Sequence, residues 1–169
     1  MKMRRIFYKI KCQYQKNGIR IEPIQEYNFR KFFSFDDEAI MKSGFRISQE
    51  GRLFDLIPFD KSLHFAVSEK MRVIIENNHI QGLSFFPICI DSPISIWGIV
   101  PTSTAGGIVN IERLNNLEDT AIEFFISSWD GSDIFCLDNT LCLICTQTVK
   151  DILESNKIAN ITYEPCYGI

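Results

Sequence analysis

One sequence pattern is written twice along this chain. Residues 63–88 read LHFAVSEKMRVIIENNHIQGLSFFPI, and residues 141–166 read LCLICTQTVKDILESNKIANITYEPC. The two segments align without a gap, Leu63 with Leu141 and so on to the end, and share six identities. In each copy an apolar run, an amphipathic stretch and a second apolar run follow one another, which predicts strand, helix and strand. One such unit is too small to bury its helix well, so we expect the two copies to share a core.

Many of the substitutions between the copies preserve a physical role. Ser68 aligns with Thr146, and either hydroxyl suits a helix N-cap. A helix face with the same spacing follows in both copies. Its residues are Met71, Ile74, Ile75 and Asn78 in the first copy and Val149, Ile152, Leu153 and Asn156 in the second.

The residues after each predicted helix are matched in the same way. His79 aligns with Lys157, which places a potential cation near the negative end of the helix dipole. Gly82 aligns with Asn160, and these two residue types tolerate a positive φ best. We therefore expect a tight turn into the following strand, which ends at Pro87 or Pro165.

The repeat extends upstream of the aligned segments. Residues 53–56 (LFDL) resemble residues 134–137 (IFCL), with three extra residues in the first copy before its next strand. Each unit, about 51–91 and 132–167, is then strand, strand, helix, strand. We predict an α+β protein with two related lobes, each a small mixed sheet with one short capped helix, sharing one core. No linker rich in Pro, Gly or Ser divides the chain, so residues 1–169 are expected to form a single domain.

Other segments carry weaker signals. Apolar residues alternate with charged ones over residues 5–12, which predicts a strand with one wet side, suited to a sheet edge that lysine protects from mispairing. Asn17-Gly18 predicts a hairpin turn into a strand over residues 19–22. A short helix is expected over residues 36–41. Strands are expected over residues 95–100, 108–111 and 122–126, with a polar loop over 112–120.

Composition restricts the compartment and the partners. The chain has no apolar run of membrane-spanning length, and its N-terminal residues lack the pattern of a signal peptide, so a cytoplasmic protein is expected. Its six cysteines are then expected to be reduced. Residues 1–35 hold nine Lys or Arg against two Glu, whereas the remaining residues hold nine basic and nineteen acidic side chains. An acidic body is a poor nucleic-acid binder and suits a basic protein partner.

The candidate catalytic and metal motifs are weak. Cys142 and Cys145 form a CxxC, but residues three apart in a strand point to opposite faces, so packing explains them better than redox or metal chemistry. A cysteine nucleophile, Cys89 or Cys136 with His64 or His79 as base, would make the chain a small hydrolase or transferase, and this alternative stays open. There is no P-loop and no GxGxxG, and we expect no cofactor and no metal.

An acidic and aromatic stretch over residues 117–133 is the candidate partner-binding surface. Tryptophan anchors protein interfaces and carboxylates steer approach. A turn beside an ordinary strand explains the same stretch too. The predicted contact residues are Glu118, Asp119, Glu123, Trp129, Asp130 and Asp133.

The segments FAVSEKMRVIIENNHIQGLSFFPI and DIFCLDNTLCLICTQTVKDILESNKIANITYEPC together resemble a group of bacterial immunity proteins from polymorphic toxin systems, first catalogued as a domain of unknown function. The resemblance covers about residues 51–167, and the second copy departs from the pattern at Thr146 and Asn160. It implies a protein that binds a toxin encoded beside it, and it carries over no catalytic residue.

The sequence therefore predicts an immunity protein that neutralises a cognate bacterial toxin without catalysis. The expected partner is that toxin protein. Neither nucleic acid nor a membrane is an expected partner, and self-association stays open. A third hypothesis, a ligand-sensing or nucleic-acid-binding module, would use the basic N-terminal segment.

Overall fold

Each copy of the repeat folds into two strands, a helix and a third strand, so the predicted α+β class is confirmed. The computed structural model describes residues 4–25, 44–60, 64–116 and 121–169. The first unit comprises β4 (Leu56–Pro58), β5 (Phe65–Ser68), α2 (Glu69–Asn77) and β6 (Leu83–Pro87). The second unit comprises β10 (Ile134–Leu137), β11 (Leu143–Cys145), α4 (Gln147–Ser155) and β12 (Ile161–Gly168).

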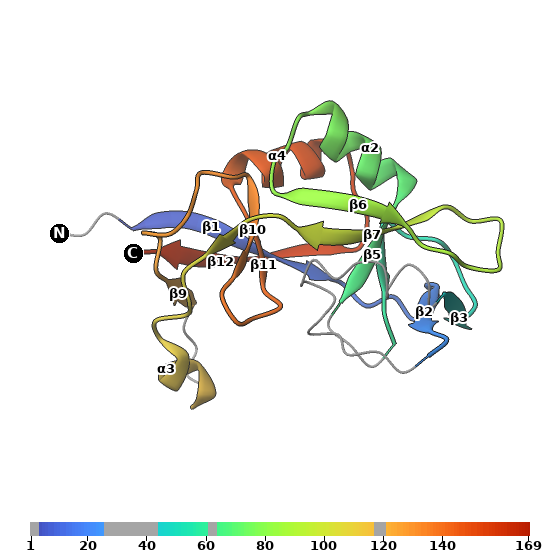
Figure 1. Ribbon diagram of the computed structural model, residues 1–169, viewed down its shortest axis with the longest axis horizontal. Helices are drawn as coiled ribbons and strands as arrows, with labels where there is room; N and C mark the ends of the chain where they lie inside the picture. Colours follow the sequence, from blue (N-terminus) through green and yellow to red (C-terminus); the bar gives the residue numbers. More distant parts are fainter. Residues whose placement is uncertain (1–3, 26–43, 61–63, 117–120) are drawn as a thin grey trace.

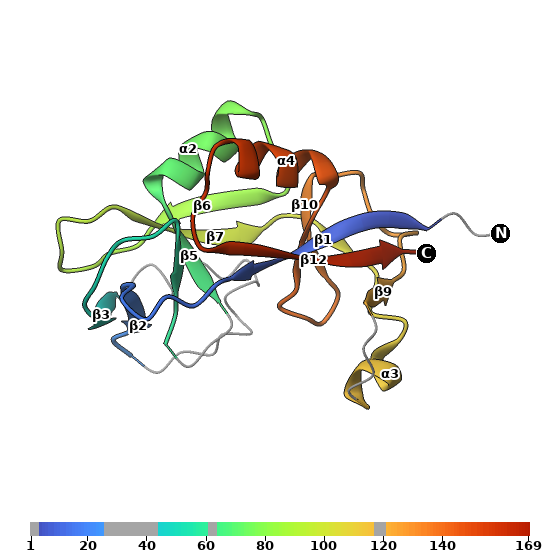
Figure 2. The ribbon, with the colours of Figure 1, turned by 180° about the vertical axis from the view of Figure 1, so that it is seen from behind.

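A fourth strand completes each unit, and the two units obtain it differently. In the first, β7 (Ile96–Pro101) pairs antiparallel with β6 and inserts between β5 and β6. In the second, β1 (Arg5–Cys12) takes the equivalent place between β11 and β12. Figure 2 shows β1 running beside β12, although the two strands come from opposite ends of the sequence. The second sheet is therefore closed by a strand that its own unit does not supply.

The position of β1 corrects two expectations. It is a central strand rather than an edge strand, and it does not form a hairpin with β2 (Arg20–Pro23), which instead pairs with β3 (Phe45–Gln49). The predicted wet side is half wrong as well, because Phe7 on that side is fully buried. Its neighbours on that side are Arg5, which is exposed, and Lys9, which is partly exposed. The alternation in the sequence therefore predicted a wet face and did not reveal the buried position between them.

Strand pairing fixes the true alignment of the units. Leu56 lies opposite Val67, and Ile134 lies opposite Cys145. Both residues of the second pair are separated from those of the first by the same offset that relates Leu63 to Leu141. The predicted insertion of three residues in the first copy is therefore wrong, because the two copies align without a gap back to Asp55 and Asp133.

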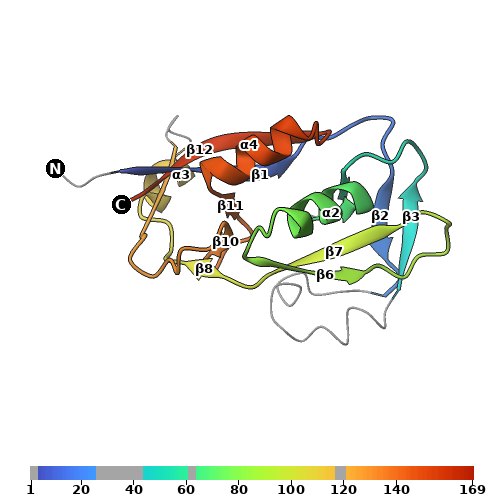
Figure 3. The ribbon, with the colours of Figure 1, turned by 90° about the horizontal axis from the view of Figure 1, so that it is seen from above.

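The two helices lie side by side over the same side of the sheets (Figures 1 and 3). Their buried residues, Met71 and Ile75 in α2 and Val149 and Leu153 in α4, belong to one apolar cluster. The expected N-caps are confirmed. Ser68 Oγ accepts from Met71 N at 3.2 Å, and Thr146 Oγ1 accepts from Val149 N at 3.5 Å. The core shared between the units is thus built from equivalent positions of both.

Both helices are followed, at the equivalent position of the repeat, by a residue in the left-handed conformation. His79 and Lys157 have a φ of 53°, and the following Ile80 and Ile158 donate their N–H groups back to Ile75 O and Leu153 O. This pattern is a Schellman motif, whose left-handed position is usually glycine. The sequence predicts only a favourable charge near the helix dipole at these two positions. The structure adds a conformational role, because both residues take a positive φ that histidine and lysine seldom adopt.

Replacing His79 with glycine is expected to raise the free energy of unfolding by about 0.5–1 kcal/mol, because glycine avoids the strain of the left-handed conformation. Urea unfolding of both proteins measures this difference. His79→Ala is the control, since it removes the imidazole but keeps a Cβ, and it should give no gain. Equal stabilisation by alanine and glycine would contradict the conformational explanation.

The remaining elements extend the second sheet at its edges. Strands β8 (Thr104–Ala105) and β9 (Ile122–Phe124) pair parallel with β10 and β12 and complete the order β8-β10-β11-β1-β12-β9. The strand expected over residues 108–111 is wrong. Ile108 makes only an isolated bridge to Phe124, and α3 (Ile111–Asn115) begins where a strand and then a loop were expected. The helix expected over residues 36–41 lies outside the described residues.

Candidate functional site

The structure separates the predicted partner-binding residues. Glu118 and Asp119 lie outside the described residues. The other four are Glu123, Trp129, Asp130 and Asp133, and they lie in different environments. Each makes contacts within the chain. The acidic and aromatic stretch is therefore not one continuous patch among the residues that the structure describes.

Glu123 lies on the helix side of the large sheet. In the register of the three strands, Ile6 is opposite Tyr167, and Tyr167 is opposite Glu123. Residues directly opposite one another share a face, so these three side chains form a row across β1, β12 and β9. Arg4 Nη2 pairs with Glu123 Oε1 at 2.7 Å, and the Arg4 guanidinium lies 5.8 Å from the Tyr167 ring centroid. The Glu123 charge is therefore already paired.

Trp129 packs on the other side of the same sheet. Its ring lies edge-on to Phe7 with centroids 5.2 Å apart, and it contacts Phe135 at 5.9 Å. Its indole Nε1 donates to Ser132 O, and the Arg5 guanidinium lies 4.4 Å from its ring centroid. Trp129 thus covers the aromatic cluster under the large sheet, with one cationic side chain laid over it.

Asp130, in the turn after Trp129, accepts hydrogen bonds from two serines. The backbone N–H of Ser132 lies 3.0 Å from Asp130 Oδ1, and Ser103 Oγ donates to the same oxygen at 2.8 Å. The N–H of Ser132, followed by the serine hydroxyls, lowers the pKa of Asp130. Since Ser103 lies between β7 and β8, the Asp130 carboxylate links the turn after Trp129 to the β7–β8 connection by hydrogen bonds.

Asp133 lies at the seam between the two units. Its Oδ2 accepts from Gln81 N at 3.0 Å, and its repeat partner Asp55 accepts from Ala159 N at 2.7 Å through Oδ2. Gln81 and Ala159 are themselves equivalent residues of the repeat. Each aspartate therefore receives an N–H from the turn after the helix of the other unit. This seam was not predicted, although the repeat offset already aligned the two aspartates in the sequence.

The end of the large sheet that carries β9 and α3 lies away from β2 and β3 (Figure 1). It holds half of the large apolar side chains identified as exposed in the described chain. We call these four residues the β9 patch. They are Ile6, Val109, Ile111 and Phe125.

The backbone holds two residues of the β9 patch close to the sheet edge. Val109 N donates to Glu123 O, and Phe125 N donates to Gly107 O. Phe124 is fully buried, whereas Phe125 is 52% exposed. A signal was present in the sequence, because two adjacent phenylalanines in an extended chain cannot both face the core.

Three described basic residues of the N-terminal segment form ion pairs within the chain. Arg4 pairs with Glu123, Lys11 Nζ with Glu164 at 2.6 Å, and Arg20 with Asp60 at 3.5 Å. These pairs partly cancel the uneven distribution of charge along the sequence.

The cysteines and histidines named in the enzyme hypothesis occupy unlike environments. Cys136 is buried, its Sγ lies 3.7 Å from Thr140 O, and burial raises its pKa to about 12. A nucleophilic thiolate needs the opposite shift. Cys89 is exposed beyond the end of β6, and His79 lies at the C-terminal end of α2. His64 is buried immediately before β5.

The CxxC cysteines face opposite sides of β11, as expected. Cys145 belongs to the core cluster beneath the helices, whereas Cys142 packs against the aromatic cluster on the other side. Burial also raises the pKa of the Cys145 thiol. In the described part of the chain, no three His, Cys, Asp or Glu side chains are grouped so that they could hold a metal ion.

Comparison of the chain with protein-family models and with curated proteins found no match. Within the described ranges, no helix has the length and apolar character needed to cross a membrane.

Proposed function

We propose that this chain is a non-enzymatic immunity protein that binds a cognate bacterial toxin and blocks its activity. The resemblance of residues 51–167 to immunity proteins of polymorphic toxin systems supports the class of function. The acidic body after residue 35 supports a protein partner with a basic surface. Binding without catalysis requires only a rigid platform and an exposed contact surface.

One observation carries the proposal. In both units the residues that repeat are used by the fold, as caps, helix faces, turns and seam contacts. The exposed apolar side chains of the β9 patch lie outside these repeated segments. Apolar side chains gathered at one end of a sheet are typical of a protein contact, and a phenylalanine among them can act as an anchor. We assign the toxin contact to the β9 patch, with the paired Arg4 and Glu123 at its border.

The experiment is co-expression with the neighbouring reading frame in a bacterial host. That frame is expected to stop growth when expressed alone and to be harmless when this chain is present. Phe125→Asp is expected to weaken binding of the two purified proteins at least tenfold, because it places a charge in the contact. Ile24→Asp is the matched control, since Ile24 is similarly exposed but follows β2 at the other end of the molecule.

Three outcomes distinguish a failure of the proposed immunity function from a failure of the assignment of the toxin contact to the β9 patch. A harmless neighbouring frame, or killing that persists when this chain is present, would contradict the immunity function. Full binding by a folded Phe125→Asp variant would be compatible with the immunity function but would show that the β9 patch is not the toxin contact. Thermal unfolding of each variant checks that it has folded.

A further inference from the structure

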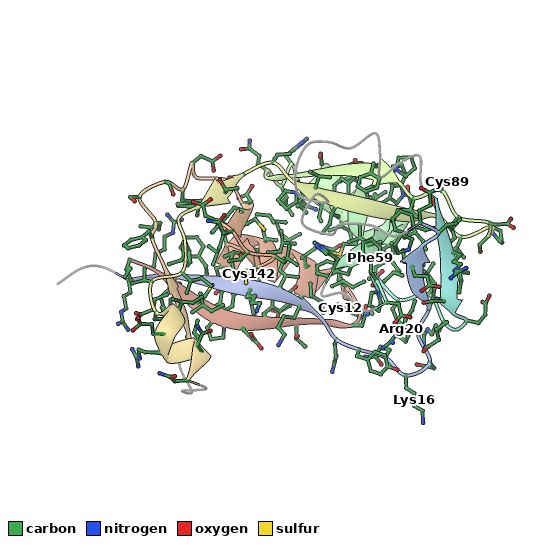
Figure 4. All side chains as sticks on the ribbon, turned by 60° about the horizontal axis from the view of Figure 1, so that its bottom comes forward. Cys12, Lys16, Arg20, Phe59, Cys89 and Cys142 are labelled. Atoms are coloured by element: carbon green, nitrogen blue, oxygen red, sulfur yellow. The ribbon has the colours of Figure 1, made fainter. Side chains whose placement is uncertain are left out.

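A pocket of about 500 Å³ opens between β1 of the large sheet and the β4–β5 region of the small sheet. Figure 4 shows Cys12, Phe59 and Arg20 near one another at this junction, with Cys142 further along β1. Residues on either side of the β4–β5 connection and residues immediately before β11 contribute to its wall. The pocket therefore lies where the strand from the N-terminal end of the chain passes between the two units.

The lining combines an apolar majority with positive charge. Its apolar wall comprises Ile10, Pro58, Phe59, Phe65 and Leu141. Three cationic side chains line it as well, and these are Lys9, Lys11 and Arg20. Among the described residues that line the pocket there is no aspartate or glutamate. A concave, mostly apolar site with a few polar groups and a volume of this size is typical of small-molecule binding.

Lys11 is paired with Glu164 at 2.6 Å, whereas the charges of Arg20 and Lys9 are incompletely neutralised by the described residues. The Arg20 guanidinium has one long contact, from Nη1 to Asp60 Oδ1 at 3.5 Å, and its Nε is buried without a hydrogen-bond acceptor in the described chain. The Tyr14 ring, 4.2 Å from the guanidinium, holds it in place by a cation–π contact. Lys9 forms no ion pair with the described residues. The Arg20 side chain keeps 29% of its surface exposed, so its guanidinium and the Lys9 ammonium offer charged donors to an anion in the pocket.

We propose that the pocket binds a small organic anion, a monocarboxylate that carries an apolar body. The carboxylate would lie toward Arg20 and Lys9, and the apolar body would contact Phe59, Phe65 and Leu141. Inorganic phosphate shares the charge but leaves the apolar wall empty, so it is expected to bind weakly. This proposal stands independently of the toxin contact, which lies at the other end of β1.

The test uses the full chain and 4-phenylbutyrate as the probe, with 4-phenylbutan-1-ol as its uncharged counterpart. Calorimetric titration is expected to show saturable binding of the acid, at least tenfold tighter than of the alcohol. Arg20→Met is expected to weaken acid binding about tenfold. Lys16→Met is the matched control, because Lys16 precedes the same strand but does not line the pocket (Figure 4).

The position of the probe is read from cysteine alkylation followed by mass spectrometry. Bound 4-phenylbutyrate should slow alkylation of Cys142, which lines the pocket, and leave the exposed Cys89 unchanged. Failure of the acid to bind, equal affinity for acid and alcohol, or equal protection of both cysteines would overturn the proposal. If Arg20→Met does not fold, Lys9→Met decides the role of charge, and unchanged affinity in it would count against the site.

Discussion

Replacing Gly82 with alanine is expected to destabilise the protein by about 4 kcal/mol or to prevent folding altogether. Gly82 has a φ of 108°, a conformation that side chains with a Cβ rarely adopt. A Cβ added there would lie 1.7 Å from Ile134 O, which belongs to the backbone of the other unit. Ile134 N also donates to Gln81 O at 2.9 Å, so the two chain segments cannot separate without breaking the seam. Urea unfolding, followed by circular dichroism, measures the loss.

Two other glycines provide controls for Gly82→Ala. Gly131 has a φ of 92° but no described atom within 4 Å of an added Cβ, so Gly131→Ala isolates the conformational cost, about 1–2 kcal/mol. Gly107 has open space for a Cβ, and Gly107→Ala should leave stability nearly unchanged. Equal losses for Gly82→Ala and Gly131→Ala would show that the contact with Ile134 contributes nothing.

Replacing Asp55 with alanine is expected to lower the free energy of unfolding by about 3 kcal/mol. The Asp55 side chain is buried and accepts from Ser68 Oγ and from Ala159 N, both at 2.7 Å. Its removal leaves a buried hydroxyl and a backbone N–H without their acceptor, at the N-cap of α2 and at the seam. Asp55→Asn should recover part of the loss, because one amide oxygen can replace only one of the two carboxylate oxygens as acceptor. The same urea unfolding experiment compares the variants.

Asp133 is the control that the repeat supplies. It holds the equivalent position, but its side chain is more exposed and accepts only the Gln81 N–H across the seam among the described residues. Asp133→Ala is therefore expected to cost about 1 kcal/mol. If both alanine variants lost the same stability, burial and the additional bond to Ser68 would not explain the importance of Asp55.

The repeat made the local structure predictable. Caps at Ser68 and Thr146 and the positive φ of Gly82 and Asn160 follow from short-range chemistry, and both expectations are confirmed. The apolar members of the expected helix faces pack toward the core, whereas Asn78 and Asn156, expected on the same faces, are exposed. The reason that Gly82 and Asn160 differ was not predictable. Asn160 bridges to Leu56 with its side-chain amide, donating to Leu56 O and accepting from Leu56 N, whereas Gly82 lets its backbone approach Ile134 directly.

The long-range structure was less accessible from the sequence. An alternating sequence with lysines is compatible both with an edge strand and with a central strand. The central position of β1 could not be predicted, because it depends on pairing with β11 and β12 from the opposite end of the sequence. The candidate site shows the same limit. Trp129 and Glu123 are close in sequence, yet they lie on opposite sides of one sheet, and the β9 patch collects residues from distant parts of the sequence.

The central position of β1 also determines the order in which the strands can pair while the chain is being synthesised. This strand is made before either of its neighbours, β11 and β12, and its pairing cannot be completed until both have been translated. Meanwhile the strands of the first unit, β4 to β7, are complete within residues 56–101 and can associate as they emerge. Phe7 and Ile10, buried in the finished protein, stay uncovered throughout that interval. The burial of Phe7 and Ile10 in the large sheet is therefore completed only after residues 143–168 have been made.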